Sequence, residues 1–184
     1  MQVKLPNVRI AFPEIFRATP FKEGDDPTFS ATFLIPKGSA LDKEIEAAIQ
    51  ETAKAKWGAK AEQILKSIRH NPNRFCYQDG DTKSYDGFEG HMALRAKSKV
   101  RPLVIDTDKS PLTEADGRPY SGCYVHASVD IFTYDNSGKG ISSQLRGVRF
   151  FKDGDAFAAG RPASVNEFDE FDNLGEGATA DDLV

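Results

Sequence analysis

Two stretches of the chain alternate between apolar and polar residues. Residues 28–35 and 123–134 both show this period of two, which is typical of a strand with one buried face. A turn at residues 136–138 leads into a further strand over 141–151, so the second stretch is expected to form a hairpin with it. The side chains predicted to face the interior are Phe29, Ala31, Phe33 and Ile35 in the first stretch, and Cys123, Val125, Ala127, Val129 and Ile131 in the second.

Weaker patterns complete the predicted fold. Residues 3–12 are interrupted by Pro6, which predicts a strand at a sheet edge or with a bulge, and residues 91–105 are predicted to form one more strand. Between residues 39 and 70 the apolar period changes to that of a helix, with Ser39 as the N-terminal cap. We therefore predict a mainly β fold of the α+β class, with about five mostly antiparallel strands in a small barrel and one helical insert.

Charge is distributed unevenly along the chain. The 184 residues include 28 acidic and 24 basic ones, but seven of the acids and none of the bases fall within residues 165–184. Phe168 and Phe171 lie among these acids, so the segment combines negative charge with flat apolar rings, as single-stranded nucleic acid does. This composition favours a tail that imitates such a ligand, although acidic tails are also common as solubilising ends.

The strongest candidate for binding chemistry is the segment 95–101, in which every second residue is a cation. Arg95, Lys97, Lys99 and Arg101 would lie on one face of an extended strand, about 6.6 Å apart. This spacing resembles the separation of phosphates along a stretched single strand, so the row is suited to follow a nucleic-acid backbone. Lysine and arginine also protect exposed sheet edges, but four consecutive like charges repel one another unless an anion neutralises them.

Aromatic rings are the second requirement of such a site, because bases stack on them without sequence preference. Tyr85 and Phe88 are favoured, since they lie with Lys83 in a long polar loop that leads into the basic strand. The remaining candidate rings are Phe12, Phe16, Tyr77, Tyr120, Tyr124 and Tyr134, and we expect the core to need none of the candidate rings, including Tyr85 and Phe88. Further cations that could widen the binding path are Arg9, Arg17, Arg118, Arg146, Arg149 and Lys152.

Other kinds of site have less support in the sequence. His70, His91 and His126 lie in different predicted elements and lack the spacing of a zinc site. No phosphate-cradling glycine loop and no nucleophile elbow occurs, so we expect neither a cofactor, nor a bound metal, nor a catalytic residue. A carboxylate site for a divalent metal nevertheless stays open in the loop that contains Asp106, Asp108, Glu114 and Asp116.

Nothing in the sequence marks export or membrane insertion. The first residues lack an apolar signal segment, and no apolar run approaches the roughly 18 residues of a membrane span. Without an export signal, Cys76 and Cys123 are expected to be reduced thiols. These features predict a cytoplasmic protein with no membrane partner.

The whole pattern resembles the bacteriophage single-stranded-DNA-binding proteins of the oligonucleotide/oligosaccharide-binding (OB) fold. It is most similar to a phage family whose members contain a segment like Gly147-Val148-Arg149-Phe150-Phe151-Lys152-Asp153-Gly154, followed by Phe-Asp-Glu-Phe as at residues 168–171. The resemblance implies an OB-fold nucleic-acid-binding domain over residues 1–162, with the helical insert at 39–70, and an acidic, flexible C-terminal tail over 163–184.

The same resemblance implies a non-enzymatic factor of phage DNA replication and recombination, located in the host cytoplasm. Its tail would compete with DNA for the binding groove and would contact a polymerase, helicase or primase. Many such tails end in an aromatic residue, whereas this one ends in Leu183-Val184, so the two tail phenylalanines are expected to serve instead. The tail residues expected to bind partners are Phe168, Asp169, Glu170, Phe171, Asp172, Asp181 and Asp182.

The sequence leaves two other functions open. One is a metal-dependent enzyme that processes nucleic acid through the carboxylates of residues 106–116, and the other is a virion adaptor whose acidic arm binds a basic partner. RNA also stays open as the ligand, because stacking and phosphate contacts do not read the 2′-hydroxyl. The oligomeric state is not determined, and a homodimer stays open.

Overall fold

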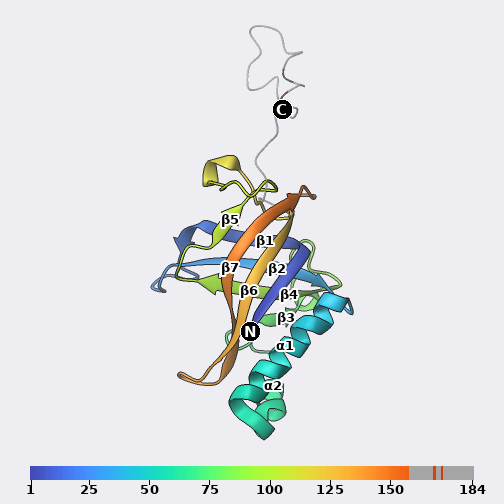
Figure 1. Ribbon diagram of the computed structural model, residues 1–184, viewed down its shortest axis with the longest axis vertical. Coiled ribbons are helices and arrows are strands. Elements are labelled where there is room, and N and C mark those ends of the chain that lie inside the picture. Colours follow the sequence, from blue (N-terminus) through green and yellow to red (C-terminus); the bar gives the residue numbers. More distant parts are fainter. Residues whose placement is uncertain (158–167, 169–170, 172–184) are drawn as a thin grey trace, which may run out of the picture.

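The structure of the protein, a computed structural model, describes residues 1–157, Phe168 and Phe171. Within these residues, seven strands form one sheet in the order β3-β4-β2-β1-β6-β7-β5. A parallel contact between Lys97 of β4 and Gln144 of β7 closes β1, β2, β4, β7 and β6 into a five-stranded barrel (Figure 1). The predicted barrel is confirmed. The strands are β1 (Gln2–Thr19), β2 (Thr28–Pro36), β3 (Tyr77–Asp79), β4 (His91–Ser98), β5 (Leu103–Ile105), β6 (Tyr124–Tyr134) and β7 (Gly140–Lys152).

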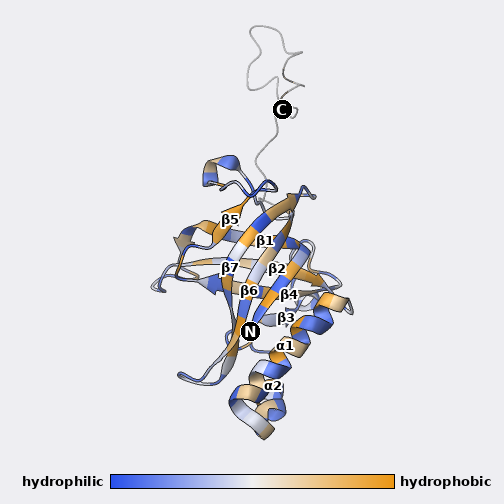
Figure 2. Ribbon diagram, viewed as in Figure 1, coloured by the Kyte–Doolittle hydropathy of each residue, from blue (hydrophilic) through white to orange (hydrophobic). Residues whose placement is uncertain are grey.

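The predicted hairpin is formed by β6 and β7. Their register runs from Tyr134 opposite Gly140 to Tyr124 opposite Lys152. Figure 2 shows apolar and polar residues alternating along both strands. All the side chains that the two alternating stretches predict to face the interior are buried, and burial of a large aliphatic one contributes about 1.5–3 kcal/mol.

Of the two alternatives predicted for the first strand, an edge position or a bulge, the structure shows the bulge. β1 pairs with β2 on one side and with β6 on the other. Pro6 is accommodated because the register with β6 shifts between Leu5 and Val8, which is the predicted bulge. At the bulge Asn7 adopts a φ of 49°, and its backbone N–H donates a hydrogen bond of 3.0 Å to Nδ1 of His126.

The single strand predicted over residues 91–105 is wrong, because the chain turns in the middle of it. β4 ends at Ser98, whose hydroxyl accepts a hydrogen bond of 3.0 Å from the backbone N–H of Val100. Such a local bond replaces a bond of the sheet ladder. The chain then enters β5, which pairs in parallel with β7.

The helical insert covers one end of the barrel (Figure 1). It consists of α1 (Ala40–Trp57), a 3-10 turn (Gly58–Lys60) and α2 (Ala61–Ile68), and α1 packs against β1, β2 and β6. Ser39 Oγ accepts a hydrogen bond of 3.2 Å from the N–H of Asp42, as the predicted cap requires. In the part of the chain that the structure describes, no helix combines the length and apolar character needed to cross a bilayer.

Candidate nucleic-acid interface

The outer surface of β1, β2 and β4 carries the basic row together with exposed rings. On β4, Arg95 lies opposite Thr32 of β2 and Lys97 lies opposite Ser30. Their neighbours in sequence, Ala96 and Ser98, are buried in the barrel, so the two cations point outward as the alternation predicts. We call this surface the ring–cation face and define it by Phe12, Phe21, Tyr85, Arg95 and Lys97.

The four cations of the row do not form one regular line. Lys99 and Arg101 follow the end of β4 and lie in the bend before β5. Lys99 Nζ lies 3.6 Å from a carboxylate oxygen of exposed Asp26, a separation at which a surface ion pair contributes little. Lys97 and Lys99 line the same hollow, of about 400 Å³, so the positive surface continues around the end of the strand.

Arg101 turns back toward the barrel. Its guanidinium donates a hydrogen bond of 3.0 Å to the main-chain oxygen of Phe16 and lies 5.5 Å from the ring centroid of Phe29. The predicted spacing therefore holds between Arg95 and Lys97 and is lost after Ser98.

Three rings form a cluster on the same outer surface as Arg95 and Lys97. Phe12 and Tyr85 meet edge to face with centroids 5.0 Å apart, and Tyr85 meets Phe88 in the same way at 5.2 Å. Phe12 is 50% exposed and Tyr85 is 54% exposed, whereas Phe88 is 3% exposed. Phe12 and Tyr85 therefore offer aromatic faces to a ligand, and Phe88 supports them from below.

The support under the cluster is a small apolar layer outside the barrel. Phe88 packs on Ala11, Leu34 and Ala93, which belong to β1, β2 and β4, and Phe157 packs at the edge of this layer. The expectation that the core does not need Phe88 is wrong, because this ring is the centre of that layer.

Phe12 is held in a backbone conformation that bulky residues rarely adopt. Its φ is 51°, at a second bulge where the register of β1 with β2 shifts between Ala11 and Glu14. Its N–H donates a hydrogen bond of 3.3 Å to the hydroxyl of Ser121. Such a conformation costs roughly 1–3 kcal/mol and is typical of functional sites.

The loop that carries Tyr85 and Phe88 is fixed at its base by a clasp around Lys37. Lys37 Nζ pairs with the carboxylates of Asp79, at 2.6 Å, and Asp81. Asp81 also accepts a hydrogen bond of 2.8 Å from the N–H of Gly90 at the far end of the loop. Lys37 lowers the pKa of both carboxyl groups, so the clasp is fully charged at neutral pH.

A further cation–ring pair lies at the loop between β1 and β2. The guanidinium carbon of Arg95 is 4.1 Å from the ring centroid of Phe21, and Phe21 is 69% exposed. Partial burial lowers the pKa of Arg95, but an arginine stays protonated. The sequence reasoning missed Phe21, although an aromatic residue next to Lys22 in a polar turn is the same signal that favoured Tyr85.

Other predicted binding residues lie in the core or in local contacts. Tyr77 is 1% exposed and its hydroxyl donates a hydrogen bond of 2.6 Å to Asp42, while Tyr120 is 6% exposed and its hydroxyl contacts Asp153 at 2.7 Å. The expectation that the core does not need these two rings is wrong. Phe16 is half-buried against the main core, and Lys83 is exposed.

The acidic loop considered for metal binding has a local partner for each carboxylate. Arg118 pairs with Asp106 and lowers its pKa. Within the described residues, no group of three or more His, Cys, Asp or Glu side chains is placed to hold a metal. The remaining carboxylates of this loop also have partners: Asp108 pairs with Ser110, Asp116 with Thr113, and Glu114 with Arg17.

The residues assigned to partner binding in the tail lie mostly outside the described part of the chain. Asp169, Glu170, Asp172, Asp181 and Asp182 all do so. Phe168 and Phe171 are described; both are exposed, and their ring centroids are 6.0 Å apart.

Known proteins similar to this chain come from bacteriophages. The family model described as "Enterobacter phage Enc34, ssDNA-binding protein" matches residues 1–184. "Putative protein p50" of Acyrthosiphon pisum secondary endosymbiont phage 1 is 55% identical over 172 residues, which cover 92% of this chain and 94% of that protein.

Solved structures from bacteriophage Enc34 are also similar. Its single-stranded DNA-binding protein in complex with ssDNA has a TM-score of 0.71 and 26% identity, over 84% of this chain and 88% of that one. A C-terminal truncation of that phage protein has a TM-score of 0.68 and 28% identity, over 85% and 88% of the two chains. The chain therefore belongs to the family of the ssDNA-binding protein of Enterobacter phage Enc34.

Proposed function

We propose that this protein coats single-stranded DNA without sequence preference during phage DNA replication and recombination, in the cytoplasm of the host cell. The observation that carries the proposal is the ring–cation face. There Phe12 and Tyr85, each about half exposed, lie on the same outer surface as Arg95 and Lys97. Membership of a phage ssDNA-binding family supports the choice of ligand.

The chemistry of the face accounts for binding without sequence preference. Every base has a flat face that stacks on a ring, with about 1–3 kcal/mol per base. Lys97 is an exposed cation that binds a phosphate as a point charge, and Arg95, stacked on Phe21, adds a flat cationic surface. Neither kind of contact reads base edges or the 2′-hydroxyl, so the preference for DNA rests on the family.

The attachment point of the tail supports its role as a competitor of DNA. Phe157 packs at the edge of the apolar layer that supports the exposed rings, and its N–H donates a hydrogen bond of 3.0 Å to the main-chain oxygen of Ser121. Residues 158–184 follow Phe157 in the chain, so the acidic tail is tethered beside the ring–cation face. A tethered segment of ten residues reaches about 16–19 Å if it behaves as a flexible chain, which gives the acids an effective concentration of roughly millimolar at the face.

When DNA occupies the face, the same acids and phenylalanines become available to replication proteins such as a polymerase, helicase or primase. Phe168 to Asp172 supply two rings between carboxylates, and Asp181 and Asp182 add charge near the terminus. A basic surface with an apolar pocket is the complementary partner.

Fluorescence anisotropy on labelled dT oligomers tests the function and the tail together. The full chain should bind dT with a logarithmic salt slope of roughly −0.7 per phosphate neutralised, and should bind duplex DNA more weakly. Removal of residues 165–184 should raise the affinity for dT and for duplex DNA, and should reduce the difference between these two affinities. Absence of salt-dependent binding in both proteins contradicts the function. Equal affinity of the two proteins at low salt contradicts only the competitor role.

A further inference from the structure

A chain of ring and cation contacts leads away from the ring–cation face across β1. Arg9, on the outer side of β1, lies with its guanidinium carbon 4.4 Å from the ring centroid of Phe157 and 5.7 Å from that of Tyr124 on β6. Its Nε donates a hydrogen bond of 2.9 Å to the main-chain oxygen of Gly122. Arg9 therefore connects the apolar layer under the first face with the outer surface of β6.

The contacts continue on β6 and β7. Lys152 Nζ lies 4.9 Å from the ring centroid of Tyr124 and 5.5 Å from that of Phe151. The rings of Phe151 and His126 are stacked obliquely, with centroids 4.5 Å apart. Phe151 is 38% exposed, so this second set of rings also reaches solvent.

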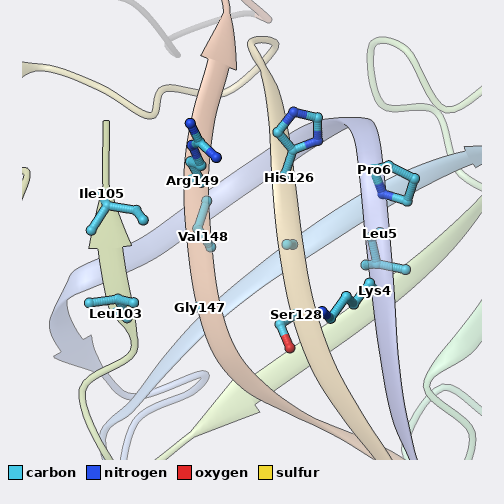
Figure 3. A pocket seen from close by; sticks show the side chains of 11 residues that line it. Lys4, Leu5, Pro6, Leu103, Ile105, His126, Ser128, Gly147, Val148 and Arg149 are labelled. Atoms are coloured by element: carbon cyan, nitrogen blue, oxygen red, sulfur yellow. The ribbon is translucent and has the colours of Figure 1, made fainter. Parts of the chain in front are cut away.

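His126 also lines a hollow of about 490 Å³ on this side of the barrel. Figure 3 shows Leu103 and Ile105 of β5 on one side of it and Lys4 and Pro6 of β1 on the other, with Arg149 at one end near His126. Leu103 is 63% exposed and points an apolar side chain at solvent. None of the residues that line the hollow is acidic.

The positive charges along this route have no ion-pair partner among the described residues: no carboxylate there pairs with Arg9, Lys152, Arg149 or Lys4. Arg9 also donates a hydrogen bond of 2.6 Å to the main-chain oxygen of Asp155, and Arg149 donates one to that of Thr107. These neutral partners leave the positive charges in place, and cations that alternate with exposed rings favour a ligand that is anionic and carries flat apolar groups. The strands β1, β6 and β7 are neighbours at about 4.8 Å, so the route from the first face is short.

We propose that a single strand of DNA that leaves the ring–cation face crosses β1 over Arg9 and binds a second segment on β6 and β7. Bases stack on Tyr124 and Phe151, phosphates contact Lys152 and Arg149, and a further base enters the hollow between Leu103 and Lys4. This inference rests on the proposed function, because the second segment extends the site on the first face. With the second segment, one protein molecule covers a longer stretch of DNA than the ring–cation face alone can bind.

A length series of dT oligomers, from about 4 to 16 nucleotides, tests the second segment. Wild-type affinity should rise by about tenfold or more once the oligomer is long enough to reach β6 and β7, as one added stack predicts. In Lys4→Glu and in Phe151→Ala this late increase should be lost, while binding of the shortest oligomers stays within about twofold of wild type. Lys43→Glu is the matched control, because it reverses the charge of another exposed lysine, on α1 rather than on β1, β6 or β7, and it should retain the increase.

The outcomes separate this inference from the proposed function. If Lys4→Glu and Phe151→Ala both keep the increase in affinity with oligomer length, the second segment is contradicted, and binding at the ring–cation face is unaffected. If wild type binds no oligomer of any length, the proposed function fails and the extension fails with it. If Lys4→Glu keeps the increase but weakens binding of a labelled peptide of residues 163–184, the hollow is a site for acidic peptide and the inference is overturned.

Discussion

Replacement of Tyr85 by alanine removes one exposed ring of the ring–cation face while the fold stays intact. Tyr85 is 54% exposed and touches Phe12 and Phe88 edge to face, at 5.0 and 5.2 Å. Loss of one base–ring stack costs about 1–3 kcal/mol. Since 1.4 kcal/mol is a factor of ten, the dissociation constant for a dT oligomer should rise by about 5- to 150-fold.

Two further variants at the same position identify the cause. Tyr85→Phe keeps the aromatic face and should bind as wild type, whereas Tyr85→Leu keeps an apolar side chain without a flat face and should bind nearly as weakly as Tyr85→Ala. Anisotropy at fixed salt gives the affinities, and thermal melting checks that each variant stays folded. Wild-type affinity in Tyr85→Ala would refute the stacking argument. Equal affinity of Tyr85→Leu and Tyr85→Phe would show that only apolar volume matters.

Three other changes probe the cations, the clasp and the core. Lys97→Ala should reduce the magnitude of the logarithmic salt slope by about 0.7, whereas Lys66→Ala on α2 should leave it unchanged; equal slopes for all three proteins contradict a phosphate contact at Lys97. The pKa of Asp81 is lowered by Lys37, so its ion pair is complete above the ordinary carboxyl value of 3.8 and is lost as pH falls through the lowered value. The amide resonance of Gly90 should report a midpoint below 3.8, and Lys37→Ala should raise that midpoint; an unchanged midpoint contradicts the clasp. Tyr77→Phe removes a partly buried hydrogen bond to a carboxylate and should lower the free energy of unfolding by about 1.5–3 kcal/mol in a denaturant titration without changing DNA affinity; weaker DNA binding by the folded variant would restore Tyr77 to the binding site.

The barrel was predictable because alternation determines which side of a strand is buried. The clear period of two in residues 28–35 and 123–134 gave both the strands and their inner faces. The break after Ser98 was less visible, because it depends on one side-chain hydrogen bond to Val100 that competes with the ladder. The position of β1 inside the sheet was left open, because Pro6 is compatible with an edge strand and also with a bulge in a central strand.

The cations of the site were easier to predict than its rings. Arg95 and Lys97 follow directly from strand geometry. Tyr85 and Phe88 lie three residues apart in one loop, yet one is exposed and the other buried, because only the packing of that loop on β1, β2 and β4 distinguishes them. Tyr77 was assigned to the surface because nothing in its local sequence reveals that its hydroxyl donates a hydrogen bond to Asp42 of a distant helix.

The most direct measurement of the central claim is a map of backbone amide shifts on addition of a short dT oligomer. If the ring–cation face binds single-stranded DNA, the amides of Phe12, Phe21, Tyr85, Arg95 and Lys97 should move in proportion to occupancy, and those of α1 and α2 should stay in place. Shifts that cluster on the helices, with the five residues of the face unmoved, would contradict the account.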